Sequence, residues 1–230
     1  MTTSPTPLGR RQMLRQAAAA ALAGTGLLLA SGPNAQATQR RAAALLPTIG
    51  QTVTMAMNAF GTSLVVPLPP PLPRLNFIGS IVVKVLVGGS DFVRLQTLNF
   101  TMEALHPLLG KVTLRLPDID VSPASILQGG PGGLVETWLQ SMDMTIERFG
   151  DLAGPFTFET TEPAKASGNL AQFPPPPLGT NPDGSPTGGA FLTAAGPIHF
   201  KPKNALPVGL PLDLSAVQLQ WDGVYEGQLT

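Results

Sequence analysis

Apolar and polar side chains alternate with a period of two through much of this 230-residue chain, and this spacing constrains its fold more than any other feature. Successive side chains of a β-strand point to opposite faces, so such alternation predicts strands with one buried and one hydrated face. Every second side chain is apolar in residues 53–59, 98–104, 112–116, 142–146 and 217–221.

Turn-forming residues separate these segments and indicate the fold class. The chain holds 25 Gly and 25 Pro, and residues 88–91 (Gly-Gly-Ser-Asp) end an apolar run that is typical of a central strand. Residues 92–116 predict a hairpin. We count eight to ten short strands, so the sequence predicts an all-β fold, an antiparallel β-sandwich or barrel. Helix is expected only in short pieces, at residues 40–46 and 133–139.

Four segments rich in proline or glycine are expected to connect the strands. Residues 67–73 (PLPPPLP) and 174–177 (PPPP) favour polyproline II, which suits strand edges and connections because proline lacks a backbone donor. Residues 178–189 have the composition of a flexible loop, and residues 129–133 (GGPGG) that of a plain loop.

The first 37 residues predict an export signal rather than part of the fold. A basic start is followed by a 14-residue apolar run, residues 17–30, and Ala35 and Ala37 supply a small-x-small cleavage pattern. Arg10 and Arg11, followed by Gln-Met-Leu-Arg, resemble a twin-arginine (Tat) signal.

This resemblance implies the Tat translocase as the export partner and a chain that folds before it crosses the membrane. Residues 1–37 are then the signal, and residues 38–230 form a single β-rich domain that is periplasmic or extracellular. The apolar run is shorter than the ~20 residues that a membrane-spanning helix needs, so no stable membrane anchor is expected.

Charge disfavours a nucleic acid as partner. The whole chain carries 14 basic and 14 acidic side chains, and cleavage after Ala37 would remove three arginines and no acid. The remaining excess of acid opposes binding to a polyanion, which requires a basic patch.

Candidate residues for catalysis are few. His106, His199 and Glu103 are the weak candidates for acid–base chemistry, because histidine and carboxylates are the usual proton carriers. Asp118 and Asp120 are weak candidates for a metal site, since a period of two places both carboxylates on one face of a strand.

Motifs for other chemistries are missing from the sequence. The chain has no Cys, which excludes a thiol nucleophile and a disulfide scaffold. It also contains no G-x-S-x-G elbow, H-E-x-x-H motif, P-loop or G-x-G-x-x-G fingerprint, so no cofactor is expected.

Residues 90–114 (SDFVRLQTLNFTMEALHPLLGKVTL), together with residues 168–175 (GNLAQFPP), resemble secreted bacterial β-rich domains of unassigned function. The resemblance supplies no catalytic residue. The leading hypothesis is therefore an exported, non-catalytic β-domain that binds a small apolar ligand within a Phe- and Met-rich interior, or binds an envelope partner. The alternatives are an envelope enzyme with a His and carboxylate site, and a structural envelope or matrix protein.

Overall fold

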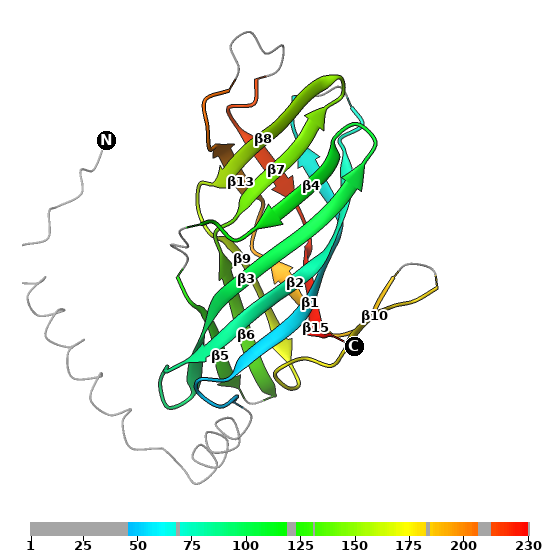
Figure 1. Cartoon of the computed structure of the whole chain (residues 1–230). Coiled ribbons are helices and arrows are strands. Elements are labelled where there is room, and N and C mark those ends of the chain that lie inside the picture. The colour runs from blue at the N-terminus through cyan, green and yellow to red at the C-terminus, as the bar shows by residue number, and fades with distance from the viewer. Residues whose placement is uncertain are drawn as a thin grey trace, which may run out of the picture. The chain divides into compact units, whose positions relative to one another are not determined.

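The computed structural model describes residues 46–67, 70–118, 123–130, 132–182, 185–206 and 213–229 (Figure 1). Fifteen strands and no helix occur in these ranges, and every strand pairing is antiparallel. The all-β prediction is confirmed, although the strands outnumber the eight to ten expected. The export signal, including Arg10, Arg11, Ala35 and Ala37, lies outside the described residues, as do Asp120 and nearly all of the helix expected at residues 40–46.

The sheet is organised around three long, consecutive strands: β1 (Thr52–Val65), β2 (Arg74–Leu86) and β3 (Phe92–His106). Their alternation is the one expected from the sequence, because Met55 and Met57 point inward and are buried. The expected hairpin is also confirmed, since β3 returns as β4 (Gly110–Arg115).

Each half of these three long strands belongs to a closed ring of eight strands. The two rings share β1, β2 and β3, and other strands of the sheet complete each ring. In the orientation of Figure 1, the upper ring closes where β14 pairs with β1, and the lower ring closes where β5 pairs with β3. The upper ring adds β4, β7 (Asp143–Phe149), β8 (Leu152–Thr160), β13 (Ile198–Pro202) and β14 (Val217–Gln220). The lower ring adds β5 (Ser125–Gly130), β6 (Gly133–Gln140), β9 (Ala164–Leu170), β12 (Ala190–Ala194) and β15 (Gly223–Gln228).

The chain repeatedly crosses the seam between the two rings, for example from β6 to β7 and from β14 to β15. Strand pairing is interrupted at the seam, so some backbone N–H groups donate hydrogen bonds to side chains instead of to a neighbouring strand. The Leu139 N–H donates to Ser125 Oγ (2.9 Å), and the Met142 N–H donates to Thr160 Oγ1 (3.1 Å). The side chains of Ser125, which is buried, and Thr160, which is partly buried, therefore complete backbone hydrogen bonding at the seam.

Large side chains fill the upper ring. Phe158 and Phe200 are fully buried there, and Phe77 and Phe100 are fully buried on the shared strands β2 and β3. The interior of the lower ring is mainly aliphatic, but it also contains two glutamates, Glu136 and Glu226, which are described below.

Two expectations about local structure are wrong. Residues 133–139 were expected to be helical but belong to β6, in which Leu134, Glu136, Trp138 and Gln140 are buried in alternation, as a period of two requires. Residues 178–189 were expected to be a flexible loop but contain a small hairpin of β10 (Leu178–Thr180) and β11 (Pro186–Gly188).

Candidate functional site

An apolar cavity of about 10 Å³ lies inside the barrel at the seam between the two rings. Its walls include Ala59 and Thr62 of β1, Met102 of β3, Trp138 of β6 and Met142. This volume is close to the smallest that holds one water molecule, so the side chains nearly fill the interior.

Thr62 reaches the cavity because β1 is irregular at this point. The pairing of β1 with β2 shifts between Ala59 and Thr62. Gly61 lies within this bulge at a φ of 67°, a conformation that favours glycine, and its N–H donates to Asn76 Oδ1 (2.8 Å). The bulge therefore sets the direction of the Thr62 side chain.

Trp138 projects into the barrel opposite a small residue. Its cross-strand partner on β9 is Ala166, which leaves room for the indole. The indole packs between two other rings, with centroids 6.0 Å from Phe100 and 5.9 Å from Trp221. The alternation of β6 thus places a large ring with a polar N–H at the centre of the molecule.

Two polar atoms at this cavity have no hydrogen-bond partner among the described residues: Trp138 Nε1 and Thr62 Oγ1. Both residues are only 2% exposed. An unsatisfied buried polar group destabilises a fold by about 1–3 kcal/mol, so such groups are rare unless they have a task. The accessible walls of the cavity are apolar, so neighbouring atoms cover both groups, and a bound molecule would reach them only after the lining had repacked.

Trp221 forms part of the barrel wall between β14 and β15. It contacts the cavity on one side and an open surface groove of about 530 Å³ on the other, which Gly61, Arg74 and Asp222 also line. Its indole N–H donates to the Gly196 carbonyl (3.0 Å). One side chain, held by one hydrogen bond, therefore separates the groove from the interior.

Glu136 and Glu226 form a buried carboxyl pair below the cavity. Each is 1% exposed, and the two side chains share a hydrogen bond. Glu136 lies two residues from Trp138, and Glu226 two residues from Val224, which also lines the cavity. Residues at i and i+2 share a face of a strand and are about 6–7 Å apart, so the pair adjoins the cavity.

Burial disfavours the charged form of both carboxyls. It raises the pKa of Glu226 from 4.5 to about 7. The pKa of Glu136 is also raised well above its ordinary value, first by burial and then by the charge of Glu226. Protons are therefore held inside the lower ring at pH values where exposed glutamates are ionised.

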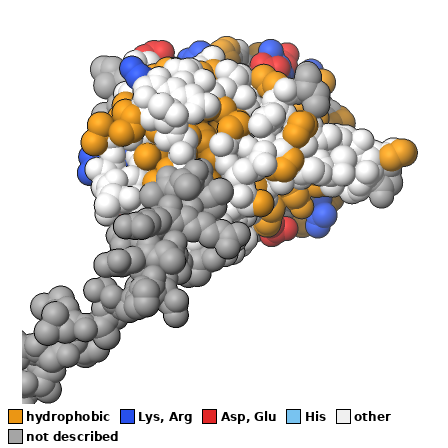
Figure 2. Space-filling model, turned by 90° about the horizontal axis from the view of Figure 1, so that it is seen from below, with side chains coloured by type: hydrophobic (Ala, Val, Ile, Leu, Met, Phe, Trp, Pro, Cys, Tyr) orange, Lys and Arg blue, Asp and Glu red, His pale blue; other side chains and the backbone are white. Residues whose placement is uncertain are grey.

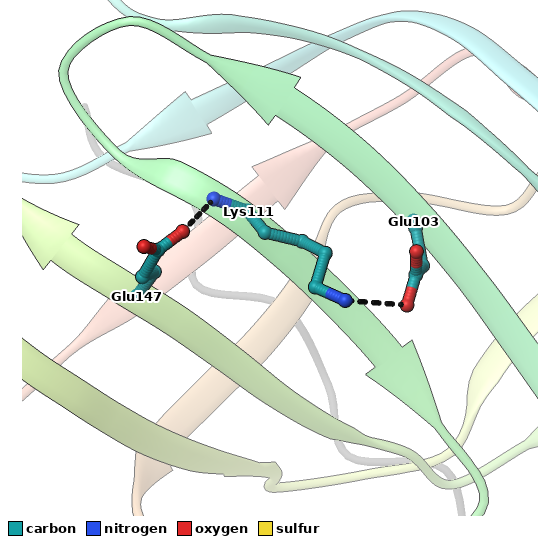
Figure 3. A network of polar contacts seen from close by, with 3 residues as sticks. All are labelled: Glu103, Lys111 and Glu147. Carbon is teal, nitrogen blue, oxygen red and sulfur yellow. Dashed lines mark hydrogen bonds and ion pairs between the residues drawn. The ribbon is translucent and has the colours of Figure 1, made fainter.

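The acid–base candidates lie elsewhere. Glu103 is on the outer face of β3, where its carboxylate pairs with Lys111 Nζ (3.2 Å), while the Lys111 backbone N–H donates to Glu147 Oε2 (2.7 Å) (Figure 3). His106 ends β3, and its Nδ1 accepts from the Leu108 N–H (3.2 Å).

His199 is exposed on β13, and its carbonyl accepts from the Thr161 N–H (2.9 Å). In the part of the chain that the structure describes, no ion pair joins His106 or His199 to a carboxylate.

Asp118 is exposed after β4, near Lys203. The pKa of Lys203 is raised mainly by its hydrogen bond to Asp143 (2.6 Å), while burial opposes this shift and the charge of Asp118 adds to it. Over the ranges described, no group of three or more His, Asp or Glu side chains is placed to hold a metal ion.

The residues of this interior site were not among the sequence-based candidates, although the sequence contains a signal for them. Glu136 alternates with Leu134 and Trp138, and Glu226 follows Val224 by two residues, so each glutamate shares a strand face with an apolar residue. A charged residue on an otherwise apolar face is informative, because glutamate is almost never fully buried without a partner.

Fold and site together define an antiparallel β-barrel with an apolar cavity and a buried carboxyl pair. No family model matches the sequence, and no curated protein matches it. Among solved structures, the chain is similar to DynF from the dynemicin biosynthesis pathway of Micromonospora chersina, with a TM-score of 0.58 and 15% sequence identity over 81% of this chain and 84% of DynF. At this identity the similarity supports the fold alone. No helix that could cross a membrane occurs in the residues described.

Proposed function

We propose that the protein is an exported, non-catalytic binding protein that holds a small apolar molecule in the cavity at the seam. The observation that carries this proposal is the apolar cavity inside the barrel, whose wall includes Trp138, a buried residue with no partner for its indole N–H in the described chain. Export is proposed on the first 37 residues of the sequence alone.

A small apolar molecule can bind only if the cavity enlarges, and the residues that line the cavity allow such a change. An eight-stranded barrel is wide enough either to be filled by side chains or to hold one small ligand. Met102 and Met142 line the cavity, and methionine repacks readily because it is unbranched and flexible. On β9, Ala166 and Gly168 add little bulk beneath Trp138 and Glu136. Native mass spectrometry of the exported protein tests the proposal, since a retained apolar molecule is expected.

Removing the unpaired polar atoms is expected to stabilise the free protein and to weaken binding. Thr62→Val should raise the free energy of unfolding by about 1 kcal/mol, because it replaces a buried, unsatisfied hydroxyl by a methyl group of similar size, while Trp138→Phe should gain less because it also removes packed ring volume. The same variants should bind dodecan-2-one about 5- to 10-fold more weakly in isothermal titration calorimetry, because the ketone oxygen loses a donor. Lower stability in both variants would indicate that these atoms serve the fold instead.

A second prediction concerns how a ligand passes between the surface groove and the cavity at Trp221. Trp221→Ala should increase the dissociation rate of dodecan-2-one on the order of 10-fold, because the variant opens the wall between groove and cavity. Trp221→Phe is the matched control and should change the rate by less than about 3-fold, since it keeps a ring in place. Stopped-flow measurements check both, and an unchanged rate in Trp221→Ala would place the entrance elsewhere.

A further inference from the structure

The charges around the barrel interior are all acidic. Among the described residues, the buried charged side chains are Glu136, Glu226 and Asp143, and Lys203 already pairs with Asp143. Figure 2, which views the molecule from below, shows the visible Lys, Arg, Asp and Glu side chains around its edge, with hydrophobic and uncharged groups in the middle.

The strands that surround the carboxyl pair supply no cation to the interior. β1, β5 and β12 contain no charged residue, and Glu136 and Glu226 are the only ones on β6 and β15. Lys165 of β9 is exposed, as are Lys84 of β2 and Arg94 of β3. An anion that entered the barrel would therefore meet no opposite charge.

The carboxyl pair holds at least one proton. Two carboxyl groups share a hydrogen bond only when one of them carries a proton, so at least one O–H is present in the pair. Glu136 Oε2 and Glu226 Oε1 have no other partner among the described residues. Below about pH 7 Glu226 also holds a proton, because burial raises its pKa to about 7. One proton is used in the hydrogen bond within the pair, so below about pH 7 the pair adds one free O–H to the unpartnered Trp138 N–H and Thr62 O–H of the interior.

We infer that the barrel selects uncharged apolar molecules that carry an acceptor oxygen, such as long-chain ketones or esters, and rejects the carboxylates of similar length. This inference rests on the proposed binding function and deepens it. A carboxylate would lose its hydration, gain no counterion and lie near two acidic groups. An apolar amine would suit an ionised carboxyl pair, but it offers nothing to the indole N–H of Trp138.

Three ligands with matched chains test this selectivity in the intact protein: dodecan-2-one, dodecanoate and dodecylammonium. Calorimetric titration at about pH 6 should show that the ketone binds and that dodecanoate binds at least about 30-fold more weakly. Equal binding of dodecanoate, or tighter binding of dodecylammonium, would overturn the inference while the binding function stands. Absence of binding by all three would overturn the proposed function and the inference with it.

The source of the selectivity is tested by the double variant Glu136→Gln/Glu226→Gln. In this variant the penalty for dodecanoate relative to dodecan-2-one should fall to about 3-fold. Glu226→Gln alone should give an intermediate penalty and serves if the double variant does not fold. Glu159→Gln, on the exposed face of β8, is the matched control and should keep the full selectivity. An undiminished penalty in the Gln variants would overturn the assignment to this pair.

Discussion

Raising the pH from about 5 to about 8 is expected to lower the free energy of unfolding on the order of 3 kcal/mol through the buried carboxyl pair. The pKa of Glu226 is about 7 in the folded state, against 4.5 for an exposed glutamate. The folded state therefore retains a proton that the unfolded state releases, and each pKa unit corresponds to about 1.4 kcal/mol. The contribution of this retained proton to the free energy of unfolding is fully present below pH 4.5 and is lost as the pH rises through about 7. The raised pKa of Glu136 acts in the same direction.

Urea denaturation of the wild type and of Glu226→Gln over this pH range measures the effect. The variant cannot ionise at this position, so the two proteins should be similarly stable near pH 5, and the variant should be more stable by about 3 kcal/mol near pH 8. Glu159→Gln should follow the wild type, because Glu159 lies in an exposed ion pair with Lys201. The pKa of Asp213 is lowered and that of Lys203 is raised, so the ionisation of these two groups does not change the free energy of unfolding between about pH 5 and about pH 8. Parallel pH profiles for wild type and Glu226→Gln would contradict a buried, protonated pair.

The replacement Gly79→Ala is expected to lower the free energy of unfolding by about 3 kcal/mol. A Cβ atom at Gly79 would collide with the Thr101 carbonyl oxygen and would lie 2.6 Å from Met102 Cα. Both atoms belong to the backbone of β3, so the clash can be relieved only if β2 and β3 move apart. These strands belong to both rings, and overpacking of this kind typically destabilises by about 1–3 kcal/mol or more.

Gly132→Ala is the matched control, because no atom lies within 4 Å of its added Cβ. Its effect should stay within about 0.5 kcal/mol, as for an ordinary surface change. Thermal and urea denaturation followed by circular dichroism measure both variants. Equal stability of Gly79→Ala and Gly132→Ala would mean that β2 and β3 do not approach as closely as described.

Much of the secondary structure could be predicted because its physical cause is local. Alternation in residues 53–59 and 92–116 correctly indicated strands, since one buried and one hydrated face follow from strand geometry. In residues 133–139 the alternation is weak, because Leu134 and Trp138 lie on one face of β6 and Val135 and Leu139 on the other.

The candidate site could not be predicted in the same way. Glu103 and His106 were chosen because their residue types carry protons, but position on the barrel decides whether such a group is perturbed. Glu103 faces solvent in an ion pair, while Glu226 is enclosed and its pKa is raised to about 7. Burial, rather than residue type, separates the two glutamates.

By itself, the sequence determined the clearly alternating strands, such as those in residues 53–59 and 92–116, and the faces they bury, because the pleat of a strand alternates between neighbouring residues. Only the tertiary structure decided that β14 closes one ring on β1 and β5 another on β3, and that Trp138, Glu136 and Glu226 meet inside. Glu136 and Glu226 approach each other across β9 and β12, which separate their strands in the sheet. That order depends on pairings between segments distant in the chain, and local alternation of side chains carries no information about which strands will pair.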